Sequence, residues 1–544
     1  MTNDPANGRT GGRILVDALR IHGADTIFSV AGESYLALLD ALYDVQNDIR
    51  LITCRKETGA SNMAEAYGKL TGKPGICVVT RGPGACHASI GVHTAFQDST
   101  PMILLIGDVP RHERERESFQ EVDYGFMFAP LAKWVVRIEA PRRIPELMAR
   151  AFRTATSGRP GPVAVVLPED MLSEICDVPD TPPYETTHAH PGDGDMAKLR
   201  ALLSAAARPM VIVGGSGWTE EACRDIAEFA GANALAVCCS FRRQHIFDND
   251  HPSYAGTLGF SATPALAQRI RDADLIVTVG ARLGSMTTGS YGLISAPTPA
   301  QTLIHVHADA NEIGRVYQPA LGIQSSMAAF AAGAAALEPI SAPPWRDWRE
   351  AARRDFLQSL EPDPYDGNLD LGRIMVSLRE RLPDDAIITT EAGNFSGWTH
   401  RFLTFRRLNS QLGPTSGAMG YGVPAAIAAK FVHPDRVVVG CSGDGGFLMS
   451  ENELATAVRY GLDPIFLVFN NNTYGTIRLH QRRHYPGRTI GTELTNPDFA
   501  ALAKAYGAFG ETVTETAQFA PAFERALAAK TAAVIELRMD RVDD

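Results

Sequence analysis

A single carboxylate stands among glycines at Gly443-Asp444-Gly445-Gly446, shortly after an apolar run that begins at Val437. A second polar cluster, three asparagines ending at Asn472, follows the apolar run Ile465–Phe469. Asn471 comes 27 positions after Asp444, a spacing that suits one crossover between neighbouring parallel strands. Because the carboxyl ends of parallel strands meet at one edge of a sheet, we expect the two clusters to lie together.

These residue types suit a metal ion and a phosphate group. A carboxylate, an amide oxygen and a backbone carbonyl are hard oxygen ligands, which Mg²⁺ prefers when it also bridges phosphates. Gly443, Gly445 and Gly446 allow backbone N–H groups to approach a diphosphate at the start of the next helix. Taken singly, the glycine segment is most simply a turn and the asparagines a loop. Their pairing at two strand ends predicts a metal–diphosphate site.

The elements that position these clusters are predicted from alternating apolar strands and helical patterns along the chain. This alternation indicates an α/β protein with three doubly wound parallel-sheet domains. We place these domains at residues 10–178, 195–340 and 366–544. Segments rich in proline and aspartate, at Cys176–Asp195 and near residues 338–367, separate them.

Composition limits the classes of partner. The net charge of −11 argues against a nucleic-acid or anionic-membrane surface, so we expect neither partner. No apolar run approaches the roughly 20 residues that span a bilayer, and the start of the chain lacks the apolar core of a signal peptide. The eight cysteines are scattered and form no C-x-x-C pair. These features predict a cytoplasmic protein.

The G-D-G-x-F segment, followed by the asparagines, resembles the thiamine-diphosphate signature of the acetolactate synthase, pyruvate decarboxylase and oxalyl-CoA decarboxylase superfamily. The resemblance covers nearly the whole chain and implies thiamine diphosphate and Mg²⁺ as cofactors. It implies that Asp444, Asn471 and the carbonyl of Thr473 bind the metal. In TSGAMGYG, it implies that the Gly417 carbonyl accepts from the 4′-amino group and that Met419 bends the cofactor. The remaining cofactor-binding residues would be Gly393, Asn394, Gly443, Gly445, Gly446, Tyr474 and Gly475.

The segment CRKETGASNMAEAYGKLTG matches the superfamily's segment with an essential glutamate, here Glu57. The chemistry requires a carboxylate there, because its hydrogen bond to the pyrimidine N1′ favours the imino tautomer that deprotonates the thiazolium carbon. Outside this context Glu57 is an ordinary helix-start glutamate. The resemblance also implies that Glu57 and Asp444 of one site come from two subunits, so we expect a homodimer at least and a homotetramer as the usual assembly.

The central block begins with VIVGGSGWTEEA, which suggests a nucleotide fold. Its G-x-G-x-x-G pattern is incomplete, because Glu220 takes the third glycine's place. By resemblance, Asp309 falls where relatives contact a ribose, and Arg282 could reach a phosphate. Relatives use this domain for FAD, for ADP or for nothing, and we expect ADP or an empty site rather than FAD.

Three differences between this sequence and other members of the superfamily narrow the chemistry that the resemblance implies. His480 stands where acetolactate synthases carry a tryptophan, and the adjacent histidines of pyruvate decarboxylases are missing. The segments GPGACHA and SFQEVD instead resemble those of 2-hydroxyacyl-CoA lyases, which implies that His87 and Gln120 face the thiazolium. His87 also has a plain interpretation, as a loop histidine bonded to backbone.

Glu493, in the loop TIGTELTNPDF, is unusual at a position that relatives place beside the active-site mouth. It is either an exposed loop carboxylate or a general acid–base near the substrate hydroxyl. By resemblance it favours a lyase that cleaves 2-hydroxyisobutyryl-CoA or a similar 2-hydroxyacyl-CoA to formyl-CoA and a ketone or aldehyde, reversibly. An acyl-CoA substrate needs basic residues along its phosphates. Our candidates, from regions matching oxalyl-CoA decarboxylase, are Arg242, Arg243, Arg401 and Arg407.

Two other functions stay open. The first is an acetolactate-synthase-like carboligase or decarboxylase of free 2-ketoacids. The second is a non-catalytic family member used in binding or assembly, which the intact set of Glu57, Asp444 and Asn471 disfavours.

Overall fold

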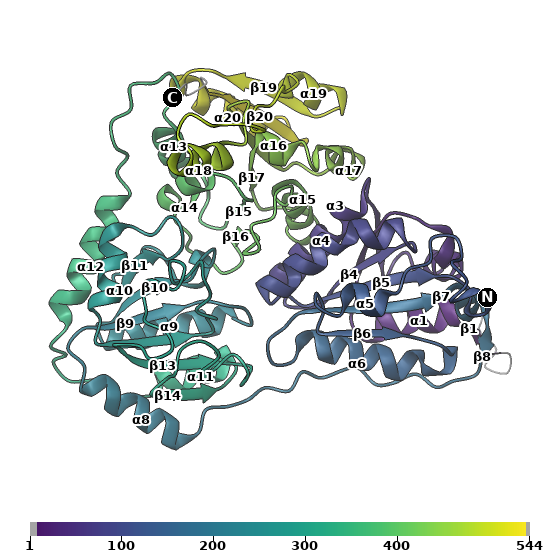
Figure 1. Ribbon diagram of the computed structural model, residues 1–544, viewed down its shortest axis with the longest axis horizontal. Helices are drawn as coiled ribbons and strands as arrows, with labels where there is room; N and C mark the ends of the chain where they lie inside the picture. The colour runs from purple at the N-terminus through teal and green to yellow at the C-terminus, as the bar shows by residue number, and fades with distance from the viewer. Residues whose placement is uncertain (1–7, 540–544) are drawn as a thin grey trace. The chain divides into compact units, whose positions relative to one another are not determined.

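The structure is a computed structural model and describes residues 8–539. It contains three six-stranded sheets whose strands are all parallel (Figure 1). This architecture confirms the predicted fold class of three α/β domains.

The N-terminal sheet has the strand order β3-β2-β4-β5-β7-β6, and helices cover both of its faces (Figure 1). Its central strands are buried along their whole length, as strands covered on both faces must be. A two-stranded antiparallel ribbon joins β1 (Arg9–Thr10) to β8 (Ile175–Cys176). The strands are β2 (Thr26–Ser29), β3 (Arg50–Thr53), β4 (Gly75–Val79), β5 (Met102–Asp108), β6 (Trp134–Arg137) and β7 (Pro162–Pro168); the helices are α1 (Gly11–Ile21), α2 (Leu36–Tyr43), α3 (Glu57–Thr71), α4 (Pro83–Asp98), α5 (Tyr124–Phe128), α6 (Ile144–Thr156) and α7 (Glu169–Ser173).

The central sheet has the order β11-β10-β9-β12-β13-β14, with one apolar cluster on each face. Its strands are β9 (Pro209–Val213), β10 (Ala236–Cys239), β11 (Tyr254–Thr257), β12 (Leu275–Val279), β13 (Thr302–His307) and β14 (Leu321–Gln324). Its helices are α8 (Asp193–Ser204), α9 (Glu220–Ala232), α10 (Pro264–Asp272), α11 (Met327–Ala335) and α12 (Arg346–Ser359).

The C-terminal sheet has the order β16-β15-β17-β18-β20-β19. The two strands that precede the polar clusters, β17 and β18, are direct neighbours, as the 27-residue spacing predicts. Its strands are β15 (Ile387–Thr389), β16 (Gln411–Leu412), β17 (Val438–Gly443), β18 (Ile465–Asn470), β19 (Phe509–Val513) and β20 (Ala533–Arg538); its helices are α13 (Leu371–Arg381), α14 (Ser396–Phe402), α15 (Gly422–Val432), α16 (Asp444–Phe447), α17 (Leu454–Arg459), α18 (Gly475–His484), α19 (Phe499–Ala505) and α20 (Phe519–Ala528).

The described chain divides into two compact units that do not follow the order of the sequence. The first takes the described residues through Thr187, together with Val423–Pro434 and Ser450–Leu462. Most of α15 and all of α17 therefore pack with the N-terminal sheet, where the Phe431 ring lies 6.1 Å from that of Phe28. The second unit takes the central sheet and the rest of the C-terminal sheet.

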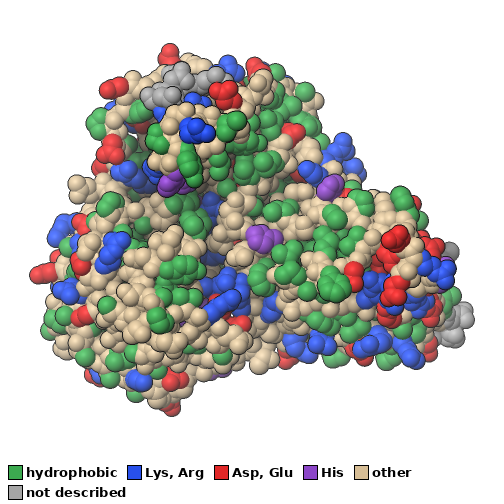
Figure 2. All heavy atoms as spheres, viewed as in Figure 1, with side chains coloured by type: hydrophobic (Ala, Val, Ile, Leu, Met, Phe, Trp, Pro, Cys, Tyr) green, Lys and Arg blue, Asp and Glu red, His purple; other side chains and the backbone are tan. Residues whose placement is uncertain are grey.

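Charged side chains on the first unit are largely paired. Arg111 bonds to Asp170, and Arg114 lies beside Glu139. Figure 2 shows basic and acidic side chains intermixed over this part of the visible face. The segment Arg111–Glu117, in which the sign of the charge alternates, is thus part of a surface of mixed charge. Between residues 8 and 539, no helix has both the length and the apolar character that crossing a bilayer requires.

Candidate cofactor-binding site

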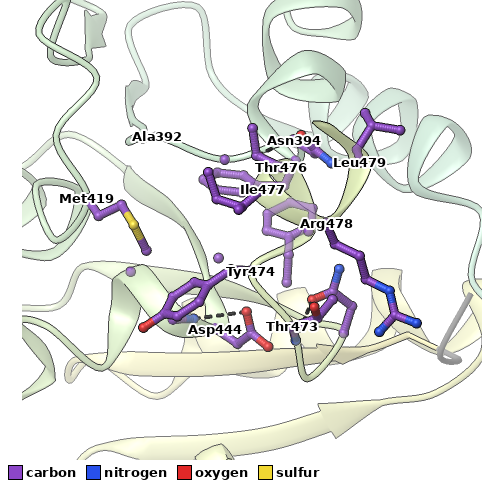
Figure 3. A pocket seen from close by; sticks show the side chains of 18 of the residues that line it. Ala392, Asn394, Met419, Asp444, Thr473, Tyr474, Thr476, Ile477, Arg478 and Leu479 are labelled. Atoms are coloured by element: carbon purple, nitrogen blue, oxygen red, sulfur yellow. Dashed lines mark hydrogen bonds between the residues drawn. The ribbon is translucent and has the colours of Figure 1, made fainter. Parts of the chain in front are cut away.

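A cavity of about 480 Å³ opens at the carboxyl edge of the C-terminal sheet (Figure 3). Its size is within the range of small-molecule and cofactor sites. All twelve residues that the sequence analysis assigned to cofactor binding line it: Gly393, Asn394, Gly417, Met419, Gly443, Asp444, Gly445, Gly446, Asn471, Thr473, Tyr474 and Gly475. Their contacts with a cofactor stay a prediction.

Parallel pairing explains why these residues meet. Gly443 at the end of β17 pairs in register with Phe469 near the end of β18, so the chain leaves both strands at one edge. The glycines after β17 are required by close packing. A Cβ atom on Gly445 would lie 2.5 Å from the Tyr474 ring, and one on Gly446 would lie 1.8 Å from Glu391 Oε1. The segment therefore presents bare backbone to the cavity.

Asp444 is the carboxylate of this cavity and is only 3% exposed. Its Oδ1 accepts a hydrogen bond from Gly445 N at 2.9 Å, and its Oδ2 accepts one from Asn496 Nδ2 at 2.8 Å. Burial raises the pKa of Asp444 above its ordinary value, and these donors oppose the rise. A cation beside the carboxylate would offset this desolvation cost.

The neighbouring oxygens fit a hard divalent cation. Asn471 Oδ1 accepts from Thr473 N at 3.1 Å, which folds the asparagine side chain back over the loop that carries Thr473. Among the described residues, no group of three or more His, Cys, Asp or Glu side chains could hold a metal. An ion here would therefore depend on the mixed set that the sequence analysis predicted: one carboxylate, one amide and one carbonyl.

Several lining residues were missed by the sequence analysis. Arg478 and Arg482 stand one turn apart on α18, a helix with no buried residue and no acidic one. In Figure 3, Arg478 extends from this helix beside the loop that carries Thr473. Trp398 and Ile477 add apolar surface to the wall. The sequence signal for the arginines was their four-residue spacing directly after the asparagine loop.

Glu493 is exposed and does not line the cavity. Its backbone forms an isolated antiparallel bridge with Thr473. Its neighbour Thr492 is 2% exposed, and the Thr492 carbonyl accepts hydrogen bonds from Tyr474 N and Thr473 Oγ1. The segment is thus attached to the predicted metal loop, and the Glu493 side chain is exposed to solvent.

In the first unit, the other three predicted catalytic residues gather around the start of α4. Glu57 is the first residue of α3, and its Oε2 lies 3.0 Å from His87 Nδ1. Gln120 has a left-handed backbone with φ +65°, and its carbonyl lies so close to Gly82 that a Cβ there would approach to 2.7 Å. The His87 side chain is therefore bonded to a carboxylate rather than to backbone, contrary to its plain interpretation.

Glu453 holds the backbone directly before Glu57, a role that the sequence did not reveal. Its buried carboxylate accepts hydrogen bonds from Arg55 N at 3.1 Å and Lys56 N at 3.0 Å, just before α3. The start of α3 has no side-chain cap of its own. A residue nearly 400 positions away thus fixes the backbone that presents Glu57.

Three of the four arginines proposed for CoA make protein contacts. Arg242 is 2% exposed and donates to the backbone carbonyls of Pro414 and Glu391, on segments that flank the cavity. Arg243 donates to the Gly215 carbonyl, and Arg401 to that of Ser359. Arg407 is exposed. Arg242 thus ties the edge of the sheet together, and a CoA contact for any of the four stays a prediction.

The residues proposed for a nucleotide in the central block also bond within the protein. Arg282 pairs with the buried Glu312 at 3.3 Å. Asp309 Oδ1 accepts from Asn311 N at 2.9 Å. ADP binding by this domain stays a prediction.

The glycine-flanked carboxylate, the asparagine loop and the helix-start glutamate are the features on which the resemblance to thiamine-diphosphate enzymes rests. Family profiles of thiamine pyrophosphate enzymes match in order along the chain. The N-terminal TPP binding domain matches residues 9–126, the central domain 196–333 and the C-terminal TPP binding domain 391–537.

Named relatives agree with these profiles. The acetolactate synthase isozyme 2 large subunit of Escherichia coli is 30% identical over 98% of this chain and 96% of its own length. A probable acetolactate synthase large subunit of Methanocaldococcus jannaschii is 32% identical over 91% and 86%. The acetolactate synthase large subunit of Parasynechococcus marenigrum is 31% identical over 98% and 88%. The chain belongs to the thiamine pyrophosphate enzyme family.

Family membership confirms the superfamily resemblance and thiamine diphosphate as the cofactor class. The narrower assignment to the 2-hydroxyacyl-CoA lyases is not supported to the same degree, because these relatives are acetolactate synthases.

Proposed function

We propose that this protein is a thiamine-diphosphate-dependent carboligase or decarboxylase of free 2-ketoacids, similar to acetolactate synthase. The observation that carries this proposal is the end-to-end similarity to acetolactate synthases, which covers 98% of this chain and 96% of the Escherichia coli relative. The protein contacts of Arg242, Arg243 and Arg401 also favour a free acid over an acyl-CoA.

Asp444, Asn471 and the Thr473 carbonyl would hold Mg²⁺, and the bare backbone of Gly443–Gly446 would receive the diphosphate. When bound, thiamine diphosphate supplies an electron sink for the carbanion formed when a bond beside a carbonyl breaks. Glu57 would hold a proton at the pyrimidine N1′ of this cofactor. Glu453 keeps its backbone in place.

A 2-ketoacid carries one negative charge that the protein must recognise. Arg478 and Arg482 are the basic side chains that line the cavity. Guanidinium groups bind carboxylates with paired hydrogen bonds. This supports an anionic substrate of low molecular mass.

The 2-hydroxyacyl-CoA lyase is the second candidate, and one observation favours it. His87, from the segment that resembles those lyases, bonds to Glu57 at 3.0 Å. A histidine there could exchange a proton beside the reacting atoms. Formyl-CoA would then be a product, and the Arg407 side chain is an exposed candidate for a CoA phosphate.

One product screen separates the two. The full-length protein with thiamine diphosphate and Mg²⁺ is supplied with pyruvate, or with 2-hydroxyisobutyryl-CoA, and products are identified by mass spectrometry. We expect CO₂ release and a condensed hydroxyketoacid from pyruvate, and neither product from Glu57→Gln. Formyl-CoA and acetone from the thioester, with pyruvate unchanged, would overturn the proposal in favour of the lyase.

A further inference from the structure

Asn496 lies against the proposed metal ligand and has no role in the function described so far. Its Nδ2 donates to Asp444 Oδ2 at 2.8 Å and to Asn470 Oδ1 at 2.9 Å, so both amide hydrogens are used. Its Oδ1 is buried and has no hydrogen-bond partner in the protein. We propose that Asn496 is a positioning residue that orients the Asp444 carboxylate for Mg²⁺. This inference rests on the proposed cofactor site.

The orientation of the Asn496 amide is fixed by the network behind it. Asn470 Nδ2 donates to Glu536 Oε1 at 2.7 Å, which turns the Asn470 carbonyl oxygen toward Asn496. Glu536 is fully buried and is held by Arg538 and by the Thr512 hydroxyl. Facing a carboxylate oxygen and an amide oxygen, Asn496 must present its NH₂ group.

This donor controls how Asp444 meets a cation. One carboxylate oxygen receives the Gly445 N–H and the other receives the Asn496 amide, so rotation of the carboxylate would break both bonds. The arrangement resembles the outer contacts that orient metal ligands in other proteins.

The segment that carries Asn496 also holds the other two proposed ligands. Tyr474 N donates to the Thr492 carbonyl at 2.8 Å, and Leu494 N donates to the Asn472 carbonyl at 2.9 Å. The loop from Asn471 to Thr473 is therefore attached to the same short stretch that reaches Asp444. Through Asn496, one segment sets the position of all three proposed metal ligands.

Asn496→Ala removes the donor and leaves the backbone attachment intact. We expect Mg²⁺ affinity to fall about 10- to 100-fold, as is usual when a contact behind a metal ligand is lost. The matched control is Asn368→Ala. It also deletes an asparagine side chain, one that donates to the Thr514 carbonyl and does not line the cavity.

The experiment measures Mn²⁺ binding by electron paramagnetic resonance and Mg²⁺ binding by calorimetry, both with thiamine diphosphate present. Thermal unfolding without cofactor is recorded in parallel. Weaker metal binding in Asn496→Ala, with Asn368→Ala like wild type, is the expected result. Equal metal affinity in all three proteins, whatever the change in unfolding temperature, would show a merely structural asparagine. No metal binding by the wild type would overturn the cofactor site itself, together with this inference.

Discussion

Glu493 is exposed on the segment that bridges to Thr473, and its role as a general acid–base stays a prediction. The sequence offered it as a general acid–base, yet in an extended segment successive side chains point to opposite sides. Thr492 takes the buried side and Glu493 the exposed one. A proton donor must come within hydrogen-bond reach of the substrate.

We expect Glu493→Gln to keep kcat and KM for a 2-ketoacid within about twofold of wild type, because the exposed side chain does not line the cavity. Steady-state kinetics with pyruvate test this. If kcat drops by roughly 10²–10⁴-fold, the residue acts in proton transfer after all, and the lyase becomes the better assignment.

Glu391 gives a prediction about pH. It is fully buried immediately before the cavity-lining residue Ala392, and burial raises its pKa to about 8. The Gly422 N–H donates to its Oε2 at 3.3 Å and opposes that rise. Between the ordinary carboxyl pKa and about 8, the native state holds a proton that the unfolded chain has released.

The free energy of unfolding should therefore fall as pH rises through this window, by up to about 1.4 kcal/mol per pH unit from this group. Glu391→Gln removes this pH-dependent contribution. The free energy of unfolding of Glu391→Gln relative to that of wild type should therefore increase between pH 5 and pH 8. Urea unfolding of the cofactor-free proteins at several pH values measures the difference. Parallel pH profiles for the two proteins would mean that Glu391 is ionised in the native state.

At the scale of elements, the glycines after β17 are required by close packing. The Cβ of Gly446→Ala would meet the fully buried Glu391 carboxyl at 1.8 Å, so that side chain would have to shift. We expect a loss of about 1–3 kcal/mol in the free energy of unfolding and weaker cofactor binding.

Gly397→Ala is the control for that change. It lies in α14, and its added Cβ would meet nothing within 4 Å. A helical alanine there should leave stability unchanged or raise it by about 0.5–1 kcal/mol. If both variants unfold at the same denaturant concentration, close packing at Gly446 is not what restricts this position.

The sequence predicted the elements around the cavity better than the contacts between them. Asp444 and Asn471 could be placed together because they follow apolar strands, and parallel pairing brings such positions to one edge. Other lining residues, such as Gly417 and Met419, were assigned only by the superfamily resemblance. The roles of Asn496 and Glu453 could not be predicted from the sequence, because loops whose paths depend on tertiary packing bring them to their partners. The same limit applies to Arg242, whose basic character suggested a phosphate contact but whose bonds go to backbone carbonyls.

At the scale of the whole molecule, Glu57 belongs to the first compact unit and Asp444 to the second. The superfamily resemblance implies that one site takes these residues from two subunits, so we propose a homodimer as the smallest active form, and a homotetramer as the usual one.

Mixing two inactive variants tests this sharing. Glu57→Gln and Asp444→Ala should each be inactive, and co-expression should restore about a quarter of wild-type activity, because half of randomly assorted dimers carry one intact site. Activity is measured per mole of protein chain, with thiamine diphosphate and Mg²⁺ in excess. Mixed dimers that form, as native mass spectrometry can verify, but stay inactive would show that each site lies within one chain.

The central claim is that the edge carrying Asp444 binds thiamine diphosphate through a divalent metal. Calorimetric titration of thiamine diphosphate into the full-length protein, with and without Mg²⁺, tests it most directly. We predict binding by the wild type that depends on Mg²⁺ and that weakens more than about 100-fold in Asp444→Ala. The account would be contradicted if the wild type bound thiamine diphosphate equally well with and without Mg²⁺, or if Asp444→Ala bound it as tightly as the wild type.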